Sequence, residues 1–448
     1  MPGISVSKIP IPFRGAGGIS WASYWATRKP TALIVTGMRD TEIDFSWTDN
    51  SGGDCSFIVY KSTDGVTYAQ DGTTVAGDTT YTATGLTAGT LYYFYVVGVK
   101  SGNESDPTNI YDTRFKITVD TTKAGSAADT FILPNYIDGT YDYYVDWGEG
   151  GAEEHITTAG NHSHTYAASG TYQIKIRGAF PRIYFNNAGD KVKLISIDNW
   201  GNIKWSLMSN AFYGCSAMNG AYDDVPNMTA ALFNCERMFS DCVLFNYKVP
   251  FNTAEVTRIF GMFYGDLAFN QSVSSFNTAK AINMTYMFYG CSSFKQSLAT
   301  FSHAASTDIK NMLFGCDINE PGTTTNYDAT LVAWAAQNPP NSLSFHGGTS
   351  KYGEGLVDNG TTDGAAANKL IQSGQNFLTT VTIGDVVYNT TDGTYAFVTA
   401  IDSDTQLSIS ADIMASGEVY RIQHSDAAKA RAKLILTDLW TITDGGYA

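Results

Sequence analysis

The sequence predicts a multidomain, mainly β protein. We expect two β-sandwiches, followed by an irregular α/β repeat solenoid with a small β-domain inserted in its C-terminal cap. Three observations predict this: residues 31–113 alternate apolar and polar residues in short runs, residues 183–320 repeat one motif, and 448 residues are too many for one ordinary domain.

The composition narrows the class of protein. Only 16% of the residues are charged, while Gly, Thr, Ser, Asn and Tyr are abundant, as in β-rich, turn-rich extracellular or virion proteins. The net charge of -15, with no basic stripe, argues against nucleic acid as a partner. No apolar run is long enough to span a bilayer, so we expect no membrane insertion. The opening "MPGISVSKIPIPFRG" lacks the basic and apolar regions of a secretory signal. Either a signal has been removed or the protein is used without secretory export, and Met1 favours the second alternative.

Residues 1–30 are predicted to form an extended N-terminal docking arm, because the two prolines of "IPIPF" disfavour a helix. Three aromatic residues, Trp21, Tyr24 and Trp25, gather at its end. A monomer would hardly expose these rings. They either pack back on the chain's own first domain or insert into another subunit of a virion, and both interpretations stay open.

Residues 31–113 are predicted to form the first sandwich. The stretch "GLTAGTLYYFYVVGV" (Gly85–Val99) resembles the conserved line of fibronectin type III domains, with Ala88 in place of the usual proline. The resemblance implies that Trp47 lies in the core and that Tyr92 is the corner tyrosine. Such domains usually act as spacers. The sequence contains no RGD motif, so integrin binding is not supported.

Residues 114–182 are predicted to form the second sandwich. Here "YYVDWGEGG" and "HSHTYAASGTYQIKIRG" resemble the hallmark of polycystic-kidney-disease (PKD) domains, which implies that Trp147 is a core residue. Three histidines, His155, His162 and His164, could together hold a metal ion. The alternative is one histidine that stabilises a turn and two solvated neighbours.

Residues 183–320 hold five copies of a motif such as "YMFYGCSSF" (Tyr286–Phe294). The central residues recur at intervals of 27, 24, 25 and 25 and are Phe212, Phe239, Phe263, Phe288 and Leu313. Three residues later stand Cys215, Cys242, Cys291 and Cys316, with Asp266 in the third copy. Apolar spacing around each centre predicts a short helix that a Gly ends, followed by an extended segment. We expect the cysteines to be stacked buried thiols rather than disulfides or zinc ligands.

Two copies, "FNTAEVTRIFGMFYGDLAFNQ" (Phe251–Gln271) and "FNTAKAINMTYMFYGCSSFKQ" (Phe276–Gln296), resemble the BspA-like leucine-rich repeats of bacterial surface proteins and Mycoplasma lipoproteins. The resemblance implies a recognition solenoid and names no ligand. Residues 321–372 and 425–448 are similar to the closing cap of these solenoids. Residues 373–424 resemble a short β module found in phage structural proteins and are expected to be an insertion in that cap.

No catalytic motif is present: the sequence has no GxSxG elbow, HExxH pair, P-loop or GxGxxG after a strand. We therefore expect a non-enzymatic protein without a cofactor. The predicted function is a structural protein of a tailed-bacteriophage virion, assembled in the host cytoplasm, such as a head fibre, tail fibre or decoration protein. Residues 1–30 would bind the capsid or tail, and the solenoid would bind a glycan or protein of the host surface. A homotrimer is expected by analogy with other appendages. The alternative is a bacterial cell-surface adhesin of the BspA-like type, while an enzyme with accessory domains is the weakest hypothesis.

Overall fold

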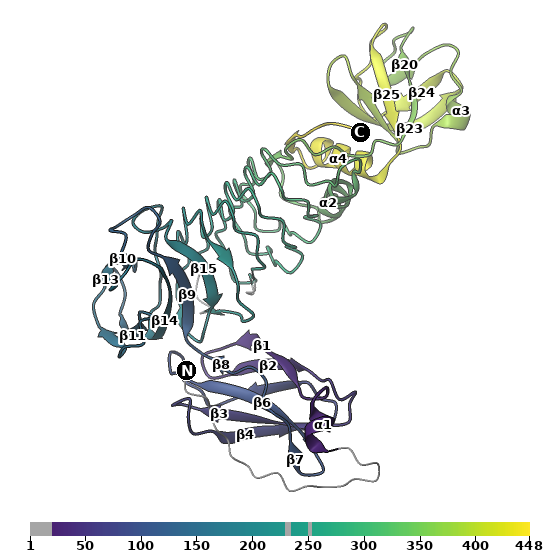
Figure 1. Ribbon diagram of the computed structural model, residues 1–448. Coiled ribbons are helices and arrows are strands. Elements are labelled where there is room, and N and C mark those ends of the chain that lie inside the picture. Colours follow the sequence, from purple (N-terminus) through teal and green to yellow (C-terminus); the bar gives the residue numbers. More distant parts are fainter. Residues whose placement is uncertain (1–19, 229–233, 250–252) are drawn as a thin grey trace. The chain divides into compact units, whose positions relative to one another are not determined.

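The computed structural model describes residues 20–228, 234–249 and 253–448 (Figure 1). It contains 8% helix and 32% strand, which confirms the mainly β class. The chain forms two compact units. The first comprises residues 1–208 and 217–231, and the second comprises residues 209–216 and 232–448. Within the described ranges, no helix has the length and hydropathy needed to cross a membrane.

The first unit begins with a β-sandwich. One sheet has the order β1-β2-β5 and consists of Thr31–Met38, Ile43–Thr48 and Thr80–Ala83. The other has the order β4-β3-β6-β7, with β8 also paired to β6, and consists of Ala69–Thr74, Ser56–Ser62, Tyr93–Lys100, Asn103–Glu104 and Tyr111–Asp112. Alternate residues of each strand point inward, which is why the sequence alternates.

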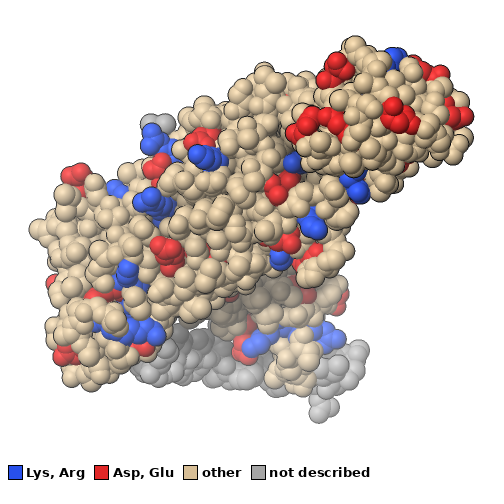
Figure 2. Space-filling view, turned by 90° about the horizontal axis from the view of Figure 1, so that it is seen from above, with Lys and Arg blue, Asp and Glu red and all other residues tan. Residues whose placement is uncertain are grey.

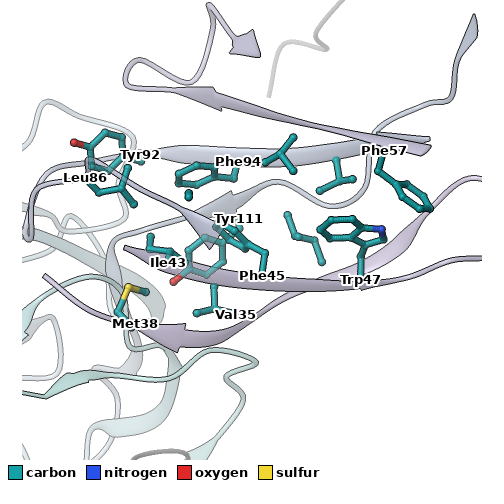
Figure 3. Packing of buried hydrophobic residues seen from close by; sticks show 14 of the residues in the cluster. Val35, Met38, Ile43, Phe45, Trp47, Phe57, Leu86, Tyr92, Phe94 and Tyr111 are labelled. Atoms are coloured by element: carbon teal, nitrogen blue, oxygen red, sulfur yellow. The ribbon is translucent and has the colours of Figure 1, made fainter. Parts of the chain in front are cut away.

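Trp47 lies in the core of this sandwich and packs edge-on against Phe57, with ring centroids 5.3 Å apart (Figure 3). Tyr92 is also buried, and its phenol oxygen accepts a hydrogen bond from the Thr87 amide at 3.3 Å. These are the positions that the fibronectin type III resemblance assigned to the two residues.

The aromatic end of the N-terminal arm packs on this sandwich. Helix α1 (Trp21–Trp25) is capped by Ser20, whose hydroxyl accepts from the Ser23 amide. Trp25 is 5% exposed and belongs to the sandwich core, and Trp21 and Tyr24 pack against it. The structure therefore favours the first of the two interpretations. The hypothesis that these rings dock on a virion loses its basis for Trp25, which is buried in the chain's own core, while Trp21 and Tyr24 are only partly buried against it. Residues 1–19 of the predicted arm lie outside the described residues.

A second β region completes the first unit. Its six-stranded sheet has the order β12-β11-β14-β9-β15-β17, with bounds Glu154–Ile156, Asp142–Asp146, Thr171–Ala179, Phe115–Asp120, Leu194–Asn199 and Asn219–Gly220. Two strand pairs lie beside it, β10 (Thr130–Leu133) with β13 (His162–Thr165) and β16 (Lys204–Trp205) with β18 (Asn227–Met228). The sheet thus continues past the predicted boundary at residue 182, because β15 pairs antiparallel with β9. Trp147 is 7% exposed, and its indole N–H donates to Glu154 at 2.8 Å.

Asp224 is buried in this unit. Its carboxylate accepts hydrogen bonds from the amides of Trp200 (2.9 Å) and Gly201 (2.8 Å) and from the Tyr111 hydroxyl (3.0 Å). Burial raises the pKa of Asp224 to about 6, against the opposing effect of these hydrogen bonds. Within the folded unit the carboxyl therefore holds its proton at pH values where an unfolded chain releases it.

This difference in pKa predicts a pH dependence of stability. Because the folded pKa lies above the unfolded value of 3.8, the contribution is fully present below pH 3.8 and is lost as the pH rises through 6. We expect the free energy of unfolding of the wild type, measured relative to Asp224→Asn, to fall by roughly 2–3 kcal/mol between pH 4 and pH 7. Urea titrations of both proteins at several pH values measure this, and a constant difference would contradict the assignment.

The second unit contains the stacked motif copies, which we call the repeat ladder (residues 209–216 and 234–316). Its successive copies are joined by parallel bridges from Asn234 to Arg258, Asn283 and Asp308. No α-helix occurs in its described residues, so the predicted short helix of each copy is wrong.

Backbone conformation explains the error. The residue two before each centre has a positive φ, between 50° and 59°, and the residue two after it has a positive φ between 57° and 84°. An α-helix requires consecutive negative φ values, so these two positions leave room only for a turn.

The unit ends in a cap, and a small sheet interrupts the sequence of this cap. The cap contains α2 (Thr325–Ala336), α4 (Asp426–Leu436) and the parallel pair β19 (Ser344–His346) and β26 (Thr441–Thr443). The sheet has the order β20-β25-β22-β23-β24-β21, with bounds Leu356–Thr361, Val419–Gln423, Val386–Asn389, Thr394–Ser403, Gln406–Ile409 and Lys369–Ile371, and the short helix α3 (Phe377–Thr380) lies beside it. Because β20 and β21 belong to this sheet, it begins before the predicted boundary at residue 373.

Candidate binding surface

The interior of the repeat ladder is a column of stacked rings. Phe212, Phe239, Phe263 and Phe288 are fully buried, and their successive centroids are 5.7, 5.9 and 5.5 Å apart with nearly parallel planes. Leu313 continues the column and is also buried. The amide of each central Phe donates to a carbonyl of the next copy; the Phe239 amide, for example, donates to Met262 at 3.0 Å, and the Leu313 amide donates to His346 of the cap at 3.1 Å. Apolar stacking and hydrogen bonds thus hold the copies together.

A second column lies three residues after each centre. Cys215, Cys242, Cys291 and Cys316 are buried and free of disulfides. Three of these thiols donate to the carbonyl of a preceding Phe at 2.9–3.1 Å: Cys242 to Phe212, Cys291 to Phe263 and Cys316 to Phe288. The thiols therefore serve as small internal hydrogen-bond donors.

Asp266 occupies the same column in the third copy. It is fully buried, and its Oδ1 accepts from the Cys242 amide at 2.8 Å. Its Oδ2 has no hydrogen-bond partner among the described residues. Burial raises the pKa of Asp266 well above the ordinary carboxyl value, so burial favours the neutral form of this carboxyl.

The side chains one residue after each centre point outward. They are Tyr213, Tyr264, Tyr289 and Phe314, while Ser240 at the same position of the second copy is buried. The rings of Tyr264 and Tyr289, and those of Tyr289 and Phe314, stack with centroids 4.8 Å apart and planes 10° apart. Tyr264 is 37% exposed and Phe314 41% exposed, so this outer column reaches the surface. Burial raises the pKa of the Tyr264 phenol, which therefore stays protonated and able to donate a hydrogen bond.

Two residues with positive φ border the outer column. Tyr286 packs edge-on against Tyr289, with centroids 5.6 Å apart. The Arg237 guanidinium lies over the rings of Tyr213 (5.8 Å) and Phe260 (5.2 Å). The outer column, Arg237, Phe260 and Tyr286 together form one surface, which we call the aromatic face.

The three histidines of the second β region have separate partners. His155 contacts Asp142 at 2.7 Å, His162 contacts the Thr158 carbonyl at 3.1 Å, and His164 contacts Glu149 at 2.9 Å. His164 also stacks on Trp147. No group of His, Cys, Asp or Glu in the described part of the chain is arranged to hold a metal ion. The interpretation of these residues as local stabilisers is thus favoured over the metal site.

Comparison with known proteins finds matches to protein-family models for two segments of the chain. The fibronectin type III model matches residues 28–114. The chain contains a fibronectin type III domain. Residues 206–326, which include most of the repeat ladder, match the family described as "Mycoplasma protein of unknown function, DUF285", the BspA-like type of surface-protein domain. No curated protein matches the chain.

Solved structures resemble parts of the chain. A Fn3-like protein from Clostridium thermocellum is 29% identical, over 19% of this chain and 91% of that one, with a TM-score of 0.18. A segment of two fibronectin type III domains from chicken tenascin is 15% identical, over 34% and 92%, with a TM-score of 0.19. Domains A168–A170 of titin are 23% identical, over 19% of this chain and 30% of the titin segment, with a TM-score of 0.17.

The sequence predicted the core of the ladder but not the aromatic face. The available signal was the residue after each centre, which is aromatic in every copy except the second. If the motif is interpreted as a helix, the turn is not taken into account. The outward direction of these rings is then not predicted.

Proposed function

We propose that this chain is a non-enzymatic attachment protein whose repeat ladder is a recognition solenoid. The fibronectin type III and BspA-like domains fit a surface or adhesin-like protein. The observation that carries the proposal is the aromatic face, because exposed contiguous aromatic surface on a rigid scaffold is characteristic of interaction sites. The β-sandwiches act as spacers in this proposal.

The carrier that we propose is the virion of a tailed bacteriophage. The likeness of residues 373–424 to modules of phage structural proteins supports it. Attachment would then use residues 1–19, since Trp21, Tyr24 and Trp25 pack on the first sandwich. The match to a Mycoplasma family favours a second candidate, an adhesin of a bacterial cell surface. Mass spectrometry of purified particles and of cell-surface fractions distinguishes the two carriers.

A competition experiment tests the attachment function. Excess purified full-length chain should inhibit adsorption of the source particle or cell to its target cells. Tyr264→Asp, which introduces a charge into the aromatic face, should weaken this inhibition about tenfold, because a buried contact would then carry an unpaired charge.

The matched control is Val66→Asp, at a 79% exposed position of the first sandwich. It should compete as well as the wild type. Equal competition by both variants would show that the ladder is not the binding surface. Absence of competition by the wild type would refute the attachment function.

A further inference from the structure

The charge of the repeat ladder differs from that of the rest of the chain. Residues 209–216 and 234–316 together contain six basic and five acidic residues, and one of the acids is the buried Asp266. The whole chain has a net charge of -15, and residues 356–423 alone contain eight acids and two bases. Figure 2 shows acidic side chains over this C-terminal sheet. An anionic ligand would therefore meet less repulsion on the ladder than on the C-terminal sheet.

Stacking decides which part of the rings a ligand can reach. Tyr289 lies between Tyr264 and Phe314, each 4.8 Å away and nearly parallel to it, so both of its faces are covered. A sugar ring cannot stack on a covered face. The edges and the hydroxyl groups remain, and an aromatic edge carries the positive part of the ring quadrupole. The column thus offers anion-attracting edges and O–H donors.

Arg237 adds a cation to this surface. It is exposed and lies over two rings. Within the described part of the chain it forms no ion pair, and the neighbouring Glu236 pairs instead with Arg258 at 3.5 Å. A guanidinium without a carboxylate partner, placed beside hydroxyl donors, is suited to bind a planar carboxylate through two parallel N–H groups.

Backbone strain falls on the same surface. Arg237 and Tyr286 have φ values of 50° and 59°, at a position where the other copies have Asn210, Gly261 and Asn311. Asn and Gly tolerate this conformation, whereas Arg and Tyr adopt it at a cost. The side chains of both strained residues contribute to the aromatic face. We infer that a role of these side chains explains why Arg and Tyr, rather than Asn or Gly, occupy the strained positions.

We propose that the aromatic face binds the carboxylate groups of an acidic polysaccharide, with Arg237 and the tyrosine hydroxyls as the donors. This inference rests on the proposed attachment function and names the class of ligand that the same surface recognises. The repeated spacing of the copies suits a polymer, because each copy presents one more set of ring edges.

Binding of the full-length chain to immobilised polygalacturonate, measured by surface plasmon resonance, tests the proposal. We expect binding to polygalacturonate and none to neutral dextran. Arg237→Asn should lower the affinity about tenfold or more, since it removes the charged donor. The same variant should unfold at a temperature about 1–3 °C higher than the wild type, because Asn relieves the strained φ. Loss of binding without loss of stability excludes a folding defect.

Further variants sharpen the result. Tyr264→Phe and Tyr289→Phe keep the stacked rings and should weaken binding severalfold. Lys280→Asn is the matched control, since Lys280 is exposed and paired with Glu255 at 2.6 Å, and its affinity should stay within twofold of the wild type. Equal losses in Arg237→Asn and Lys280→Asn would show unspecific attraction and overturn the proposal. Absence of binding to polygalacturonate, or tighter binding to dextran sulfate, would overturn it as well. If Arg237→Asn still competes normally for target cells, this inference fails while the attachment function stands.

Discussion

Phe263→Ala should destabilise the repeat ladder by about 3–5 kcal/mol, the cost of removing a fully buried aromatic side chain. The Phe263 ring stacks on Phe239, Phe288 and Phe269 at 5.9, 5.5 and 4.1 Å. In the middle of a repeat array it joins two neighbouring copies, and array stability depends on such interfaces. Hydrogen exchange followed by mass spectrometry should show lost protection of both flanking copies.

The matched control for this prediction is Phe314→Ala. Phe314 is 41% exposed and stacks on Tyr289 on the outer column. Its loss should cost only about 0.5–1.5 kcal/mol, the usual value of an aromatic pair. Similar exchange in both variants would mean that the inner column does not hold the copies together.

The sequence predicted those parts of the fold that depend on short-range patterns. Alternation along strands such as β2 indicated a sandwich, and the spacing from Phe239 to Phe288 indicated stacked repeats. The local period of the motif, however, was misinterpreted. Apolar residues at helical spacing also fit a turn with two left-handed positions, and the signal for the turn was Asn or Gly at Asn210, Gly261 and Asn311.

Domain boundaries were harder to predict because they depend on pairing between distant segments. Strand β15 completes the second sheet by pairing with β9. In the same way, β20 and β21 join the C-terminal sheet through β25 and β24. Alternation marks each strand but does not identify its partner, so the sequence assigned these strands to the neighbouring segments.

The aromatic face could not be predicted from the sequence for a related reason. Tyr264 and Phe263 are adjacent in the sequence, yet one is exposed and the other fully buried. Only the turn geometry separates them. Likewise, the strain at Arg237 is visible only in its backbone conformation.

Asp266→Cys should stabilise the repeat ladder by about 1–3 kcal/mol at pH 7, the usual cost of a buried polar atom without a partner. The substitution replaces a carboxyl whose Oδ2 has no partner among the described residues with the thiol found at this position in the other copies. In three of those copies the thiol donates to the carbonyl of a preceding Phe, and the equivalent acceptor here is Phe239. Urea unfolding of both proteins measures the change, and Glu255→Gln, an exposed carboxylate, should change the stability by less than about 0.5 kcal/mol.

The pH dependence of this gain distinguishes its cause. The folded pKa of Asp266 is raised by burial, whereas an unfolded chain releases the proton near pH 3.8. The unfolded state therefore binds fewer protons above that pH, and the wild type loses stability as the pH rises. Cys at this position stays protonated in both states across the acidic range. The advantage of Asp266→Cys should thus be smallest at pH 3 and grow towards pH 7. An advantage that does not vary with pH would mean that improved packing, and not the buried acid, accounts for the stabilisation.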